Sequence, residues 1–180
     1  MSTYKAPLTD IRFALYDVLG ADTLFAKLGY TDATRDILDA VLDEAGRFTE
    51  TVLAPLNSVG DEIGCSFDKA SGDVATPPGF KQAYTQFVEG GWTGLTASPD
   101  FGGQGLPHAI GVPLNEMVNA ANLAWGNFPL LSHGAVEALA ELGRDAGGMH
   151  HGLGVVAVDV EDRRLDHQRD IGAIGRGAAE

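Results

Sequence analysis

The hydrophobic positions recur at the spacing of amphipathic helices over most of the chain. Apolar residues three or four positions apart fall on one face of a helix. Such stripes cover residues 8–19, 37–53, 80–87, 110–121 and 128–142. No alternation of apolar and polar residues interrupts this series before residue 143. The pattern therefore predicts an all-α fold, a helical bundle, for residues 1–143.

Glycines and prolines mark the ends of these stripes. Glycine accepts the backbone conformation that closes a helix, and proline is tolerated in a first helical turn. The residues at these positions are Gly20, Pro55, Gly90, Gly91, Pro107 and Pro129. We expect Pro55 to end the second helix. Residues 57–78 have too little apolar periodicity for a long element and predict an ordered surface loop.

The composition changes after residue 143. Residues 144–180 contain no aromatic residue and no lysine, and are rich in Gly, Ala, Arg, Asp and His. The apolar run at 153–160 could form a strand, but a single strand has nothing in this chain to pair with. We therefore expect an irregular or disordered tail.

A stretch rich in glycine and proline, residues 90–107, connects the third and fourth stripes and is called the connector below. Two large aromatic residues in it, Trp92 and Phe101, are expected to fill space between helix ends. Gly102, Gly103 and Gly105 invite comparison with a phosphate-binding loop. However, the stretch has neither the Gly-x-Gly-x-x-Gly spacing nor a terminal Gly-Lys-Ser/Thr. We expect these glycines to permit a tight turn under Phe101.

Together with Thr76–Lys81 before it and Leu131–Ala135 after it, the connector resembles the N-terminal helical domain of acyl-CoA dehydrogenases. These flavoproteins desaturate acyl-CoA thioesters. The opening Tyr4–Leu8 is similar to a subgroup with an extra N-terminal helix, here residues 1–30, which includes enzymes acting on methylthio-substituted or branched acyl thioesters. The implied domains are 1–143, of this helical type, and 144–180, a tail from outside the family, for which our hypothesis is a frameshift or a truncated gene model.

The resemblance also implies what this segment does. In the family, FAD is held by a later β domain, and the catalytic glutamate comes from a C-terminal helical domain. We therefore expect no catalytic residue here, no FAD or acyl-CoA turnover by this chain alone, and a role as acyl-pocket wall and scaffold of a homo-oligomer. The implied pocket residues are Asn122, Trp125, Phe128 and Ser132; helix packing is the alternative for each.

Composition excludes several other classes. The net charge of -13 disfavours nucleic acid and anionic membranes as partners. The single cysteine excludes an internal disulfide, and the five histidines lack ligand spacing, so no metal site is expected. No run reaches the roughly 20 apolar residues of a membrane span. Without a secretion signal, a cytoplasmic location is the default expectation.

A different class of function stays open, which is a small non-catalytic helical module for binding or interaction. Amphipathic helices such as these can bury a core without further domains. If partner domains are missing, an apolar surface around Trp125 and Phe128 would be exposed. Such a surface favours oligomerisation or aggregation.

Overall fold

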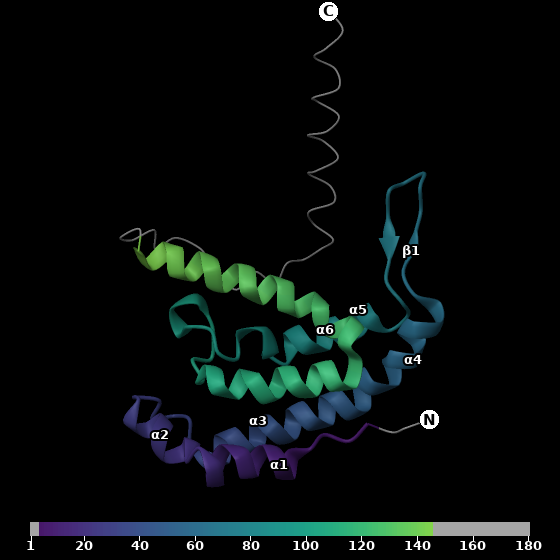
Figure 1. Cartoon of the computed structure of the whole chain (residues 1–180). Coiled ribbons are helices and arrows are strands. Elements are labelled where there is room, and N and C mark those ends of the chain that lie inside the picture. The colour runs from purple at the N-terminus through teal and green to yellow at the C-terminus, as the bar shows by residue number, and fades with distance from the viewer. Residues whose placement is uncertain (1–3, 146–180) are drawn as a thin grey trace, which may run out of the picture.

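The computed structural model describes residues 4–145, with side chains to residue 139. The described α-helices are α1 Leu8–Arg12, α2 Ala21–Lys27, α3 Arg35–Phe48, α4 Ala54–Ile63, α5 Phe80–Glu89 and α6 His108–Asp145. A π-helical segment, Phe13–Val18, continues α1, and two short 3-10 turns, Trp92–Gly94 and Pro99–Phe101, lie in the connector. Helix dominates this part of the chain, which confirms the all-α prediction (Figure 1). The expectations for residues 146–180, including a strand at 153–160, lie outside the described residues.

The helices form a bundle in which α6 doubles back on itself. α6 contacts α3 and α4, and its second half runs back in the opposite direction over the bundle (Figure 1). The reversal occurs at Asn122, the residue with non-helical backbone angles inside α6. The fourth and fifth stripes of the sequence therefore correspond to the two halves of α6.

An aromatic cluster forms the centre of the core. The Phe87 and Trp125 rings lie 5.3 Å apart between centroids and are nearly perpendicular, and Phe48 contacts both. Aromatic pairs at this separation favour such edge-to-face geometry. Around the rings are the buried apolar side chains of α3, α5 and the first half of α6. The core thus joins residues from opposite ends of the described chain.

The prediction that Pro55 ends the second helix is wrong. A π-helical turn, Thr49–Leu53, follows α3 directly, and α4 then continues to Ile63. Pro55 lies in the first turn of α4, where its missing N–H would have no partner inside that helix. The proline therefore marks a change of helix type rather than a stop.

The expected loop at 57–78 is also only partly correct. Its first residues belong to α4, and a short antiparallel hairpin follows, in which β1 Ser66–Phe67 pairs with β2 Val74–Ala75. Both strands are exposed, and the hairpin projects from the bundle (Figure 1). A two-residue pairing is too short to produce the alternating pattern by which strands are predicted.

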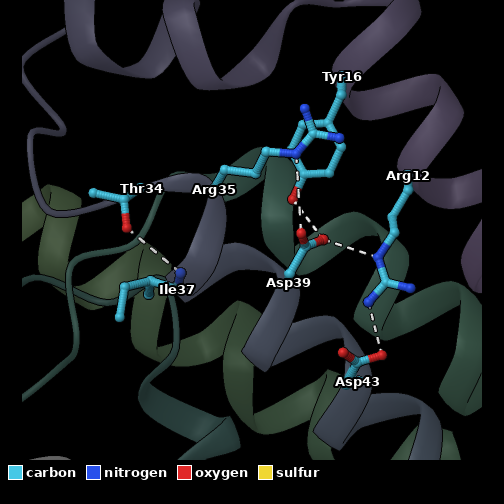
Figure 2. Close-up of polar contacts among 7 residues, drawn as sticks. All are labelled: Arg12, Tyr16, Thr34, Arg35, Ile37, Asp39 and Asp43. Carbon is cyan, nitrogen blue, oxygen red and sulfur yellow. Dashed lines mark hydrogen bonds and ion pairs between the residues drawn. The ribbon is translucent and has the colours of Figure 1, made fainter.

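A polar network fastens the N-terminal segment to α3 (Figure 2). Arg12 donates from Nε to Asp39 at 2.8 Å and from Nη2 to Asp43 at 2.7 Å. The Tyr16 hydroxyl donates to the same Asp39 oxygen at 3.0 Å, and the Arg35 guanidinium lies 4.2 Å from the centre of the Tyr16 ring. Burial, followed by the bond to Asp39, raises the pKa of Tyr16 to about 12.

Candidate functional site

The connector glycines are required by geometry rather than by a ligand. Gly102 and Gly105 have φ angles of 81° and 68°, in the left-handed region that L side chains rarely adopt. Gly103 has ordinary φ, but a Cβ there would lie 2.1 Å from the carbonyl oxygen of Ala97. No side chain fits that distance, so the chain can pass Ala97 this closely only with glycine.

The backbone amides of the connector are used within the connector. The N–H groups of residues 102–105 donate to the carbonyls of Pro99, Ser98, Gly94 and Ala97, at 2.8–3.0 Å. These donors do not point at a bound phosphate, because each already has a carbonyl partner. Trp92 is buried in the core, and Phe101 is half-buried. This geometry favours the interpretation of the connector as a structural turn.

Asn122 makes the reversal of α6. Its side-chain oxygen accepts a hydrogen bond from the Trp125 backbone N–H at 3.0 Å, which is the N-cap arrangement for a new helix. Its Nδ2 donates at 3.3 Å to the carbonyl of Leu53, the last residue of the π-helical turn. The side chain is 1% exposed. Asn122 therefore starts the second half of α6 and ties it to α4.

Trp125, three residues after Asn122, stabilises the same turn. It is fully buried, its ring contacts Phe48 and Phe87, and its Nε1 donates to the Phe80 carbonyl at 3.2 Å. The indole N–H is a donor only, so this bond satisfies it. The polar groups named for Asn122 and Trp125 are thus engaged inside the protein.

Phe128 and Ser132 lie further along the second half of α6. Phe128 is 43% exposed, and its ring lies edge-on to Phe80, 6.3 Å between centroids. Ser132 is exposed. The structure thus brings Asn122 and Trp125 together in the interior and places Phe128 beside them across Phe80, whereas Ser132 is on the surface.

Phe80 joins these residues, although sequence reasoning treated it only as part of a helical stripe. Its carbonyl accepts from Trp125, its ring meets Phe128, and a Cβ at Gly60 would lie 2.8 Å from it. The available signal was its position directly after Gly79, in the motif Thr76–Lys81.

The second half of α6 also carries a set of exposed apolar side chains, called the α6 apolar surface below. Its members are Leu123, Phe128, Leu130, Leu131, Val136 and Leu139. Leu131 is 77% exposed. The nearby carboxylate of Glu137 lies 3.7 Å from His133 Nε2 and 3.9 Å from His108 Nδ1, so protonated imidazoles there would meet a negative charge.

Within the part of the chain that the structure describes, no three His, Cys, Asp or Glu side chains are grouped to hold a metal ion. No helix among the same residues is long and apolar enough to cross a membrane. Cys65 is an exposed free thiol. The features that remain for a binding role are therefore the turn at Asn122 and the α6 apolar surface.

Two relatives share this segment. Over 144 residues, 80% of the chain, the sequence is 40% identical to 3-methylmercaptopropionyl-CoA dehydrogenase of Ruegeria pomeroyi. Over 124 residues, 69% of the chain, it is 30% identical to the broad-specificity linear acyl-CoA dehydrogenase FadE5 of Mycobacterium tuberculosis. No protein-family model matches the chain.

The resemblance to acyl-CoA dehydrogenases, predicted from the connector and its flanking motifs, is confirmed over this segment. The aligned segments make up 24% of the Ruegeria protein and 20% of the mycobacterial one. The chain therefore spans a quarter or less of the length of these curated relatives.

Proposed function

We propose that this chain supplies the N-terminal helical segment of an FAD-dependent acyl-CoA dehydrogenase, which introduces an α,β double bond into an acyl-CoA thioester. The single observation that carries the proposal is the 40% identity to such an enzyme over 144 residues. The proposal places the protein in cytoplasmic acyl-thioester and fatty acid metabolism, as part of a homo-oligomer. We take residues 1–143 as the helical domain and 144–180 as the tail, although α6 itself extends to Asp145.

Within this proposal, the four candidate residues have two different roles. Asn122 and Trp125 position the second half of α6, because their polar groups are bonded to Leu53 and Phe80. Phe128 and Ser132, which are exposed on that half, form part of the acyl-pocket wall. An apolar ring and a small hydroxyl fit a pocket that accepts a hydrocarbon or thioether chain.

FAD, when bound in the whole enzyme, accepts the hydride from the substrate. The described residues around Asn122 and Trp125 do not form a flavin site by themselves, because the polar groups there are already paired within the bundle. We therefore assign no flavin contact and no proton transfer to this chain. The chain alone should neither bind FAD nor turn over substrate.

A chimera tests the proposal directly. The aligned 144 residues of this chain replace their counterpart in the Ruegeria enzyme, and flavin absorbance and turnover with an artificial electron acceptor are measured. We expect bound flavin and turnover in the chimera, and neither in the isolated chain. Stoichiometric flavin with turnover in the isolated chain would contradict the proposal, as would a folded chimera that lacks both.

The pocket assignment has a separate test in the same chimera. Ser132→Leu adds bulk at the proposed wall, so it should change KM or the preference among acyl-chain lengths. Asn127→Leu, at an exposed position on the same half of α6, is the matched control. Equal behaviour of the two variants would remove Ser132 from the pocket.

A further inference from the structure

One carboxylate lies between two histidines at the place where the start of α6 meets its second half. His108 is the first residue of α6, whereas His133 and Glu137 lie one helical turn apart on the second half. The Oε1 atom of Glu137 is 3.9 Å from His108 Nδ1 and 3.7 Å from His133 Nε2. The reversal at Asn122 brings His108 to this place, although most of α6 separates it from Glu137 in sequence. We call these three residues the His–Glu–His cluster.

The attraction within the cluster depends on the charge of the imidazoles. At 3.7 Å and 3.9 Å the nitrogen and oxygen atoms are too far apart for a hydrogen bond, so neutral imidazoles gain little from the carboxylate. A protonated imidazole at the same distance is attracted by the opposite charge. The contact of Glu137 with His133 lies within the second half of α6, whereas its contact with His108 joins the two halves. Protonation of His108 therefore adds an attraction that holds the halves together.

The elements around the cluster carry charged groups of other types. These are Glu116 in the first half of α6, Asp100 in the connector, and Lys81 and Glu89 in α5. α3 and α4 also contact α6, and their charged side chains are exposed apart from Asp39, which binds α1. Side chains of these types keep their charges between pH 5 and 8, where histidine changes its charge. A change of charge at the cluster in that range therefore comes from its two histidines.

We propose that the His–Glu–His cluster is a pH-sensitive contact that holds the second half of α6 to the start of its first half in mildly acidic solution. An ordinary histidine is protonated below about pH 6.5, and an ordinary glutamate stays ionised above about pH 4.3. Between these values two imidazolium groups face one carboxylate, so the contact is closed. Its contribution is lost as the pH rises above about 6.5, because the histidines become neutral. The inference goes beyond the proposed function and needs no other part of an enzyme.

The contact acts on the part of α6 that the turn does not hold. Asn122 and Trp125 fix the beginning of the second half, whereas the cluster lies close to the last described side chains. Phe128 and Ser132 lie between these two attachments. Exposed ion pairs are individually weak, so the cluster should change the opening equilibrium of this segment by about two- to tenfold rather than lock it. The pH therefore adjusts how firmly the segment with Phe128 and Ser132 is held.

Hydrogen exchange of the full chain at about pH 5.5 and about pH 7.5 tests the proposal, with each rate divided by the intrinsic rate at that pH. Protection of residues 130–139, relative to that of α3, should be about two- to tenfold higher at the lower pH. Glu137→Gln removes the shared charge and should abolish this difference, and His108→Gln should abolish most of it. Glu116→Gln is the matched control, because it removes an exposed carboxylate from the first half of the same helix, and it should leave the difference in place.

Equal relative protection at the two pH values would overturn the proposal, as would a difference that persists in Glu137→Gln. If His108→Gln keeps more than half of the difference, the effect belongs to the second half alone, and the contact between the halves is disproved. His108 is 65% exposed, so this variant decides the outcome if Glu137→Gln does not fold. Salt gives an independent readout, because about 1 M NaCl screens exposed charges and should reduce the difference at least about twofold. A difference that salt leaves unchanged would contradict an electrostatic contact.

Discussion

The two halves of α6 have similar apolar content and opposite surroundings. In the first half, Ile110, Leu114 and Met117 are at most 5% exposed and belong to the hydrophobic core. In the second half, leucines of the same size are mostly exposed, up to 77% at Leu131. The difference teaches that an apolar stripe is buried only where the fold supplies a partner for it.

The attachment of the second half is concentrated at its beginning. Asn122 caps it, Trp125 buries its ring among the core aromatics, and Phe128 meets Phe80. Beyond these residues, the side chains described up to Leu139 are largely exposed. Substitutions at the attachment should therefore have far larger effects on the isolated chain than substitutions further along the helix.

The largest effect should come from Trp125→Ala. Removing a buried Trp side chain leaves a cavity and typically costs about 3–5 kcal/mol of unfolding free energy. Urea unfolding followed by circular dichroism measures this. Trp125→Phe keeps an aromatic ring but loses the indole N–H that donates to the Phe80 carbonyl, so it should cost less, about 0.5–1.5 kcal/mol. A cost below about 1 kcal/mol for Trp125→Ala would show that this residue does not attach the second half.

A smaller but more local effect is expected from Asn122→Ala. Loss of the cap and of the donor to Leu53 should cost about 1–3 kcal/mol. Hydrogen exchange should accelerate in residues 123–139 more than in 108–121, because the cap belongs to the second half. Asn127→Ala, at an exposed position, is the control and should change neither quantity. Uniform acceleration along α6 would mean that the two halves unfold as one unit.

Alkaline pH should weaken the contact between the N-terminal segment and α3. It should leave the difference between the two halves of α6 unchanged. The pKa of Tyr16 is raised to about 12, so the folded state favours its neutral form. The stability that results is complete below the ordinary tyrosine pKa of about 10 and is lost as the pH rises from there towards about 12. Unfolding free energies at several pH values should show this decline, and Tyr16→Phe should make it smaller; the rest is expected from Tyr4, whose pKa is also raised by burial.

Tyr30→Phe, which changes a tyrosine outside the Arg12–Asp39 network, is the matched control for this pH series. It should leave the decline in place. Hydrogen exchange in α6 should keep the same difference between its halves in all three proteins. A decline of unchanged size in Tyr16→Phe would assign the alkaline sensitivity to another group.

The smallest effect on stability should come from Leu131→Asn. An exposed substitution of this kind usually changes the unfolding free energy by less than about 0.5 kcal/mol. The binding of an apolar fluorescent dye should nevertheless fall, because the variant interrupts the α6 apolar surface. Thr51→Asn, an exposed change on the π-helical turn, should leave dye binding unchanged. A large loss of stability in Leu131→Asn would mean that the chain itself buries this leucine.

Local features of the fold could be predicted with good success. The stripes ending at Gly20 and Gly90 correspond to described helices, because the apolar period and a glycine end signal act within a few residues. Pro55 misled the prediction, since proline both ends helices and begins them. Which of these occurs depends on the π-helical turn before it, and that turn has no sequence signal of its own.

The candidate site residues were also only partly predictable from the sequence. Resemblance to a family selected Asn122, Trp125, Phe128 and Ser132, and their role in a pocket stays a prediction. Spacing along the chain could not reveal that Asn122 bonds to Leu53 or Trp125 to Phe80, which are 69 and 45 positions away. Such bonds form only after distant helices have packed.

By itself, the sequence determined that this segment is helical, that its connector requires glycine, and that it resembles acyl-CoA dehydrogenases. These properties depend on local spacing, backbone freedom and identity at aligned positions. The tertiary structure alone decided which apolar residues are buried. The first half of α6 is buried in the core, while the second half, which reverses at Asn122 and runs back over the bundle (Figure 1), keeps its leucines exposed, because burial requires a surface on the other side.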